Sequence, residues 1–581
     1  MSNSFQCEIR ARPFLLSYKP MSKLTRPVLA GSLAALATLA IPCWASSSAT
    51  RPHRQLSYIV QFHPDHNLQA GIAAVQKTAH ASLYRELPII SGASFTMDPG
   101  QLDAVRALPG VAAISEEATL EKTMFDVTPA VFNGDNVNNL PWTGAGIGVA
   151  VLDSGMSNHT DLNDQNGNSR IRYSQVFTPE NVQQDTCGHG THIAGIIGGR
   201  GFNPGNFTKS FRGIAPGVHF INMTVLDRWG QGRESDVIAA IDRTIQLKNQ
   251  FNIRVMNLSL GKPVRQSYVN DPLCRAVRRA WDANIVVVVS AGNEGRNNSA
   301  GTRGYGTISS PGNSPFVITV GAMRTKGTAT RSDDEITSYS SKGPTLLDRI
   351  VKPDLVAPGN RIVAAQAVDG RMRNSYMDNS VNMNFYIQNG PNQWSDQYYW
   401  MSGTSMAAPV VSGAAAVLLH KDSSLTPNQV KYRLMKTATK AFASNSTSTD
   451  AATNTQYNIQ NDIFAVGAGY LDITAALNNT EKPTRSAASP SARYNPTSRK
   501  VEIVNTTSTG QSLLWGDTTV PWSHIWGNRL LTGSSVLWGD SVVWGDITRT
   551  GGNSLLWGDS LVWGDKAPSA ETDTLALKGD N

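Results

Sequence analysis

Between residues 147 and 320 the chain alternates short, almost wholly apolar runs with longer amphipathic stretches. Runs that are apolar on both faces are typical of strands in a parallel sheet that helices cover on both sides. We therefore expect an open, doubly wound α/β domain, in which sites form at the carboxyl ends of the strands. The predicted strands are 147–152, 218–225, 255–260, 285–289 and 316–320, and the predicted helices include 236–247 and 273–283.

A smaller region, residues 56–120, has a different pattern of short alternating elements. The order strand, helix, strand, strand, helix, strand is that of a ferredoxin-like α+β domain. Ahead of a larger domain, such a unit is either a propeptide or an ordinary binding module, and its position does not distinguish these. The predicted elements are a strand at 56–62, a helix at 68–82, strand material at 89–97, a helix at 101–108 and a strand at 111–115.

The segment 23–45 has a basic start, an apolar run over 28–41 and small residues before Ala45. This pattern predicts a secretory signal peptide that is cut near Ala45, with translation starting at Met21. A membrane anchor is the alternative, although the run is short for a span and Gly31 interrupts it. We expect a secreted, extracellular protein, with contact to the cell surface left open.

The composition changes this picture in two ways. A net charge of +7 over 581 residues, without a dense Lys/Arg block, argues against a nucleic-acid partner. Once the signal peptide is cut, two of the four cysteines remain, Cys187 and Cys274. In an exported protein they predict one disulfide, and two separate buried thiols are the alternative.

Candidate chemistry begins with a run of small residues, 401–409, that leads into an Ala- and Val-rich stretch. This pattern predicts a tight turn and a buried helix, with Pro409 in its first turn and Ser405 at its N-terminus. Backbone N–H groups there stabilise negative charge on an adjacent oxygen, which suits an acyl-transfer nucleophile. Serine is also a common helix cap, so a base, an orienting acid and an oxyanion donor are needed elsewhere.

Three residues supply those roles. Asp153 ends the first predicted strand, His189 stands near the start of a small-residue helical stretch, and Asn293 follows the strand at 285–289. We expect His189 to act as base toward Ser405, with Asp153 fixing its tautomer. Asn293 is either a turn residue or an oxyanion donor beside the Ser405 N–H. A metal pair of His189 and His192 lacks an evident third ligand, so we assign no metal site.

The motifs Val151-Leu152-Asp153-Ser154-Gly155, Gly188-His189-Gly190-Thr191-His192 and Gly403-Thr404-Ser405-Met406-Ala407-Ala408-Pro409 resemble the signature motifs of subtilisin-like serine peptidases, in that family's order. The resemblance extends over about 142–477. It implies an endopeptidase that acylates Ser405, with an extended protein or peptide substrate paired to Ser259, Leu260 and Gly261. Ser290, Ala291 and Gly292, ahead of Asn293, resemble the block that carries the oxyanion asparagine and lines the substrate site.

The same resemblance implies that the small domain is an inhibitory propeptide, which the enzyme removes from itself. No cofactor is required for catalysis. Structural calcium is common in such relatives, but the tempting run 163–168 lacks the register of an EF-hand loop, so no ligands are assigned. The stretch 361–400 exceeds what the path to the serine requires, and we expect a surface insertion there, with a flap near the site as the alternative.

The C-terminal part carries a repeated Trp-Gly-Asp motif, and seven of the thirteen Trp residues fall between 515 and 563. Its geometry is either a set of Gly-Asp hairpin turns or a short β-solenoid, so we expect β structure. Its Trp residues either pack on the protein or bind envelope, glycan or substrate polymer. A rival function follows, in which the tail binds a surface or polymer and the peptidase serves only for maturation. The predicted domains are 1–45 signal region, 46–125 propeptide, 126–480 catalytic domain, 481–510 linker and 511–581 repeat extension.

Overall fold

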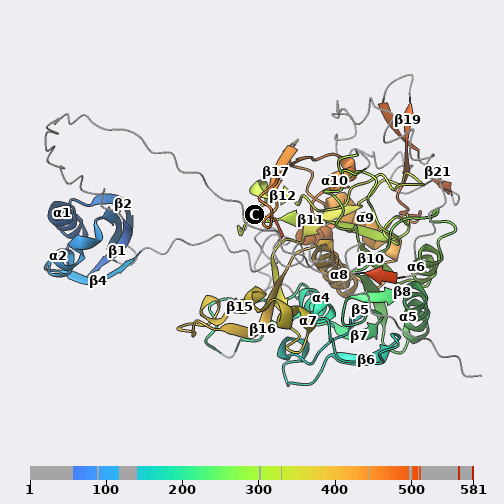
Figure 1. Ribbon diagram of the computed structural model, residues 1–581, viewed down its shortest axis with the longest axis horizontal. Coiled ribbons are helices and arrows are strands. Elements are labelled where there is room, and N and C mark those ends of the chain that lie inside the picture. The colour runs from blue at the N-terminus through green and yellow to red at the C-terminus, as the bar shows by residue number, and fades with distance from the viewer. Residues whose placement is uncertain are drawn as a thin grey trace, which may run out of the picture. The chain divides into compact units, whose positions relative to one another are not determined.

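The chain forms two compact units, Met1–Thr119 and Leu120–Asn581 (Figure 1). The predicted signal peptide and all but a few residues of the Trp-Gly-Asp repeats lie outside the described residues. Within the described part, no helix has both the length and the apolar character needed to cross a membrane. The computed structural model describes residues 56–63, 65–87, 91–116, 141–203, 205–299, 302–328, 330–443, 445–495, 500–504, 506–507, 510–511, 560–562 and 579–580.

The first unit is a four-stranded antiparallel sheet in the order β2-β3-β1-β4, with two helices packed on it. The predicted helix at 68–82 is too long, because His80 takes a left-handed conformation at φ 48° and ends the helix. The chain then forms a strand, β2, that the sequence pattern did not separate from the helix. The elements are β1 (Leu56–Phe62), α1 (Leu68–Ala79), β2 (Ser82–Leu87), β3 (Gly92–Met97), α2 (Leu102–Arg106) and β4 (Val111–Glu116).

The second unit is built on an eight-stranded sheet in the order β12-β11-β10-β9-β5-β7-β6, with β13 beside β11. Every pairing in it is parallel except that of β12. The predicted α/β fold is therefore confirmed. All five predicted strands are present, whereas β6, β12 and β13 were not predicted. The strands are β5 (Gly148–Asp153), β6 (Ile171–Val176), β7 (His219–Thr224), β9 (Ile253–Leu258), β10 (Val286–Ser290), β11 (Ile318–Arg324), β12 (Glu335–Ile336) and β13 (Leu355–Pro358).

Helices lie on both sides of this sheet, with α5 and α6 together on one side and α4 and α8 together on the other (Figure 1). Helix α8 runs through the core, and all its residues from Thr404 to Leu419 are buried. Apolar residues of the strands and of these helices form one continuous core. The helices are α4 (His189–Gly198), α5 (Glu234–Leu247), α6 (Pro272–Asp282), α8 (Thr404–Lys421), α9 (Pro427–Thr437), α10 (Ile463–Val466) and α11 (Ile473–Asn478).

The stretch 361–400 forms a three-stranded antiparallel sheet of its own. An aromatic cluster that includes Phe211, Tyr386 and Tyr398 fills its core. The Arg371 and Met372 N–H groups donate to carbonyls just ahead of α4, so the insertion packs against the loop that carries His189. Its elements are β14 (Ile362–Ala365), α7 (Arg371–Ser375), β15 (Ser380–Asn382) and β16 (Trp394–Met401).

The predicted disulfide between Cys187 and Cys274 is wrong. Both residues are buried free thiols. Cys274 lies in α6, with its Sγ 3.1 Å from Asn313 Oδ1, whereas Cys187 lies before α4 on the other side of the sheet. Burial raises the pKa of both thiols well above the usual value for cysteine. The alternative of two separate thiols therefore holds.

Residues beyond 481, whose composition predicts a linker, contact the catalytic unit. Ser489 is fully buried, and its Oγ accepts a hydrogen bond of 2.8 Å from the Nζ of Lys431, which is also buried. Further along, β19 (Ser491–Asn495) pairs with β20 (Lys500–Val504). Two segments of the repeat extension are described: β23 (Ser560–Val562) pairs with β8 (Gln231–Arg233), and Gly579–Asp580 forms a bridge to Asp450.

Candidate active site

Asp153 and His189 form a buried pair at the carboxyl edge of the sheet. Asp153 is the last residue of β5, His189 is the first residue of α4, and neither side chain is exposed. The His189 Nδ1 lies 2.7 Å from Asp153 Oδ1. A carboxylate at that distance favours the tautomer with the proton on Nδ1, which leaves Nε2 as the basic nitrogen.

A second buried carboxylate, Asp185, holds this pair in place, and the sequence did not reveal its role. Its Oδ1 accepts from Ser154 Oγ at 2.8 Å and from the Gly188 N–H at 2.7 Å, and its Oδ2 accepts from the Thr191 N–H at 2.8 Å. Burial raises the pKa of Asp185. Asp185 therefore joins the residue after Asp153 to both sides of His189.

The hydrogen bonding of the Ser405 carbonyl depends on Pro409, which lies four residues further along α8. In an α-helix the N–H of residue i bonds to the carbonyl of residue i−4, and Pro409 has no N–H to give to the Ser405 carbonyl. The Ser259 Oγ donates to that carbonyl instead, at 2.8 Å. In return, the Ser405 Oγ lies 3.3 Å from the Ser259 carbonyl. Ser405 is thereby tied to the residue that follows β9.

These contacts bring the three predicted residues to one edge of the sheet. Strands β5 and β9 are neighbours with Val151 opposite Asn257, so Asp153 and Ser259 each lie two residues further along their strands. Helix α4 begins with His189, and helix α8 begins at Thr404, one residue before Ser405. The two helices pack against each other. The structure thus assembles Asp153, His189 and Ser405 at the carboxyl ends of parallel strands, where the sequence placed the site.

Asn293 faces the same place through its contact with the start of α8. Its Oδ1 accepts from the Thr404 N–H at 2.9 Å, which orients the amide so that Nδ2 points the other way. A Cβ built on Gly403 would lie 3.5 Å from Asn293 Nδ2 and 3.6 Å from the Ser405 backbone nitrogen. Both donors therefore border the small space beside Gly403, whose φ of +152° also favours glycine. An oxygen in that space would meet two N–H donors.

The predicted substrate residues fall into two groups. Ser259, Leu260 and Gly261 follow β9, and Ser259 is tied to Ser405 as described above. On the other flank, Glu234, which follows β8, forms an ion pair of 2.8 Å with Lys262. Strand β8 and the Ser259–Leu260–Gly261 segment are therefore joined just beyond their ends.

The second group is Ser290, Ala291 and Gly292. The Ala291 N–H and carbonyl bond to Val320 and Ser309, and the Gly292 carbonyl accepts from the Ser341 N–H. These backbone groups of Ala291 and Gly292 are therefore hydrogen-bonded within the protein, where they fix the segment that leads to Asn293. Beside them lies a pocket of about 310 Å³ with Glu294 at one side. Its lining is mainly apolar: Pro263, Val264, Glu294, Asn297, Gly306, Thr307, Ile308, Ser309 and Leu346.

His192, the second histidine of the motif, has a structural environment. It is completely buried, and its Nε2 lies 2.9 Å from the Tyr399 carbonyl and 3.2 Å from the Ile362 carbonyl. Burial lowers its pKa to about 3, so the ring is neutral and donates to these carbonyls. Over the described residues, no group of three His, Cys, Asp or Glu side chains is placed to hold a metal ion.

The chain is similar to several known proteins. The model of the subtilase family matches residues 144–469. Serine protease AprX of Bacillus subtilis (strain 168) is 38% identical over 308 residues, which are 52% of this chain and 63% of that protein. The match thus spans less than two thirds of that relative. Subtilisin E of the same strain is 29% identical over 417 residues, 70% of this chain and 92% of that protein.

Among solved structures, a cold adapted subtilisin-like serine proteinase is 28% identical and covers 52% of this chain and 85% of that chain, with a TM-score of 0.37. A score this low adds no weight of its own. The family model and the sheet topology carry the comparison.

Proposed function

Because the chain belongs to the subtilase family of serine peptidases, we propose that it is a serine endopeptidase that cuts proteins through an acyl-enzyme on Ser405. The observation that carries this proposal is the buried Asp153–His189 pair, beside a serine at a helix N-terminus. A domain of the same fold with a purely structural role would not need a buried Asp–His pair at this position.

In the proposed reaction, His189 Nε2 takes the proton of Ser405 Oγ while that oxygen attacks the peptide carbonyl carbon. The carbonyl oxygen becomes an oxyanion, which the Asn293 Nδ2 and the Ser405 N–H stabilise. The imidazolium then gives its proton to the leaving amine, so that the C–N bond breaks and an ester remains on Ser405. Water adds in the same way, with His189 as base, and releases the acid.

Asp153 keeps the imidazole in place and stabilises its positive charge without taking the proton. Asp185 acts at one remove as a positioning residue, because it fixes Ser154, Gly188 and Thr191 around the pair. Substrate lies extended along Ser259, Leu260 and Gly261. This main-chain pairing supports broad sequence tolerance.

The 310 Å³ pocket is the proposed receptor for the side chain before the cut, since it adjoins Asn293 and the substrate segment. Its Val264, Ile308 and Leu346 side chains favour an apolar or long side chain, and Glu294 favours a terminal positive charge. The replacement Glu294→Gln should reduce cleavage after Lys relative to cleavage after Leu.

We also propose that the enzyme is secreted and that residues 46–125 are an inhibitory propeptide removed by self-cleavage. The signal-like segment and the α+β fold of the first unit support this assignment. The rival, a binding protein whose peptidase serves only for maturation, has in its favour the repeated Trp-Gly-Asp motif.

A fluorophosphonate reagent, which reacts with activated serines, tests the catalytic assignment. The purified protein should gain one adduct, located on Ser405 by peptide mass spectrometry, and the His189→Ala variant should gain none on the same time scale. Equal labelling of the two proteins, or an adduct elsewhere, would remove the triad as proposed.

A further inference from the structure

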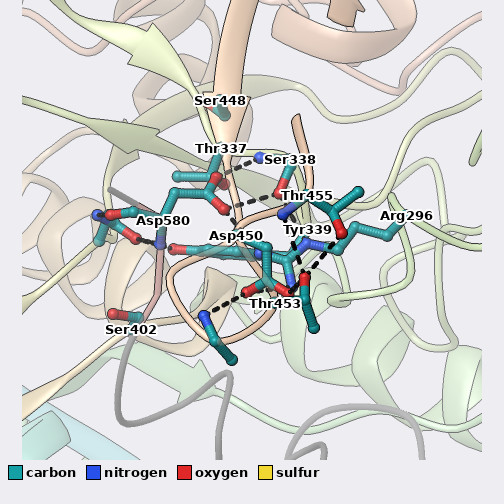
Figure 2. Close-up of polar contacts among 12 residues, drawn as sticks. Arg296, Thr337, Ser338, Tyr339, Ser402, Ser448, Asp450, Thr453, Thr455 and Asp580 are labelled. Carbon is teal, nitrogen blue, oxygen red and sulfur yellow. Dashed lines mark hydrogen bonds and ion pairs between the residues drawn. The ribbon is translucent and has the colours of Figure 1, made fainter. Parts of the chain in front are cut away.

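The end of the chain occupies a polar pocket on the catalytic unit (Figure 2). We call it the Asp580 pocket and define it by Arg296, Ser338, Asn360 and Asp450. The Asp580 side chain is 1% exposed. It lies more than a hundred residues along the chain from its nearest pocket residue, so local sequence does not impose this contact.

The pocket binds the Asp580 carboxylate with three donors. Oδ1 accepts from Arg296 Nη2 at 2.6 Å and from Ser338 Oγ at 2.7 Å, and Oδ2 accepts from the Ser338 N–H at 2.6 Å. Arg296 also forms an ion pair of 3.1 Å with Asp450. A buried carboxylate with a guanidinium and two further donors is a specific arrangement, because any one of them left unpaired would be costly.

The main chain is bound as well as the side chain. The Asp580 N–H donates to Asn360 Oδ1 at 2.8 Å, and the Asp580 carbonyl accepts from Asn360 Nδ2 at 2.9 Å. Asn360 thus holds the backbone of residue 580 through both of its amide atoms.

The residue before the aspartate must be glycine. Gly579 has φ +64°, and a Cβ there would lie 2.3 Å from both Asn360 Oδ1 and Ser402 Oγ. No larger residue fits without displacement of these groups. The pocket therefore recognises the dipeptide Gly-Asp rather than an acidic residue in general.

The same dipeptide recurs in the tail repeat, in five of its six copies; the copy at Trp526 has Asn528 in place of the aspartate. Five copies of Trp-Gly-Asp precede Gly579–Asp580 in the tail, ending at Asp517, Asp540, Asp546, Asp559 and Asp565. We propose that the Asp580 pocket is a docking site for the Gly-Asp element of the chain's own tail, and that Gly579–Asp580 holds the tail on the catalytic unit. The tail then stays attached after the chain between them is cut.

The Asp580 pocket lies beside the turn that precedes the proposed nucleophile, Ser405. Asn360 follows Gly359, whose carbonyl accepts from the Gly403 N–H at 2.8 Å, and Arg296 lies three residues after Asn293. The docked Gly579–Asp580 element therefore lies against the turn that precedes Ser405. Docking does not depend on peptidase activity, so it can be tested on an inactive protein, and its failure leaves the proposed reaction untouched.

The test uses the full chain with Ser405→Ala and a cleavage sequence for a site-specific protease inserted after Ser569, so that β23, which pairs with β8, stays with the catalytic unit. After cutting, the dissociation of the C-terminal fragment is measured by size-exclusion chromatography and by the decay of a fluorescent label on the fragment. The fragment should remain bound. With Asp580→Ala, which removes the buried carboxylate, it should leave at least about tenfold faster. Gly579→Ala should have the same effect, because its Cβ would displace Asn360 and Ser402.

Asp573→Ala is the matched control, since it removes a carboxylate seven residues before Asp580 in the same tail, and it should behave like the parent. The unfolding midpoint of the catalytic unit is measured for every variant, so that loss of the fold is distinguished from loss of docking. A synthetic peptide containing Trp-Gly-Asp should displace the fragment, whereas one with Trp-Ala-Asp should not. Equal retention or equal loss in parent, Asp580→Ala and Asp573→Ala proteins would overturn the proposal.

Discussion

At the scale of single residues, the site depends on groups that hold the reacting side chains rather than on those side chains alone. The motifs that contain Ser405, His189 and Asp153 are local in sequence, so the positions of these residues at the start of α8, at the start of α4 and at the end of β5 could be predicted. The contacts of Asp185 with Ser154 and of Ser259 with Ser405 join segments that are distant in sequence, so they could not be predicted. No pattern along the chain shows that the Ser405 carbonyl, which lacks a helix donor, is matched by the hydroxyl of Ser259.

Asn293 offers a direct test of the oxyanion site. Asn293→Ala removes one of the two donors that border the space beside Gly403, so kcat should fall about a hundred- to a thousandfold. KM should change little, because the donor acts mainly on charge that develops in the transition state. The measurement is steady-state hydrolysis of a peptide anilide. A loss confined to KM would assign Asn293 to substrate binding instead.

His192 should give the protein a dependence of stability on pH. An unfolded imidazole titrates near about 6.5, whereas burial lowers the pKa of His192 to about 3. Between these values the unfolded state binds more protons, so the free energy of unfolding falls as the pH falls from about 6.5 to about 3. Urea unfolding of the Ser405→Ala protein measures this slope.

The variant His192→Gln keeps an N–H donor but cannot be protonated in this range, so the slope should become shallower. His63→Gln, at an exposed histidine, is the control and should leave the slope unchanged. An unchanged slope in the His192 variant would show that other groups cause the acid sensitivity.

At the scale of elements, the sequence predicted apolar parallel strands well, since both faces of each are buried and the run is continuous. Strand β6 is half-buried and mixed in character, and β2 follows a helix after a break of two residues, so neither has a distinct pattern. The disulfide prediction failed because cysteine count and compartment say nothing about which side of the sheet each thiol lies on.

The approach of α4 to the loop after β5 requires a small residue. A Cβ on Gly190 would lie 2.2 Å from the Gly155 carbonyl oxygen and 3.2 Å from Asp153 Cβ. Gly190→Ala should therefore destabilise the protein by about 1 to 3 kcal/mol and reduce kcat, because it moves His189 away from Asp153. Gln165→Ala, at an exposed residue of the catalytic unit, serves as control. Urea unfolding and peptide hydrolysis measure the two effects, and equal results for both variants would contradict this packing.

At the scale of the whole molecule, the two units and the tail raise the question of which part carries the function. Residues up to Val504 include contacts to the catalytic unit, such as that of Ser489 with Lys431, so a deletion after Glu481 would remove part of the fold. Deletion of the residues after Val504 is the sharper cut. The sequence indicated where the composition changes, but packing decides where the catalytic unit ends.

A protein that lacks the residues after Val504 should retain its turnover of unrelated peptides within about threefold, since the triad and the oxyanion donors lie in the catalytic unit. Peptide hydrolysis and the binding of cell-envelope material are measured for the deleted and the full chains. Loss of both activities together would favour the rival function in which the tail does the work.

The most direct test of serine catalysis compares the precursor with its Ser405→Ala variant, with propeptide removal followed on gels and casein hydrolysis measured in parallel. We predict that the parent removes its N-terminal region and digests casein, and that the variant loses turnover by about a millionfold and remains a precursor. Equal processing and equal casein hydrolysis in the two proteins would contradict the assignment of Ser405 as nucleophile.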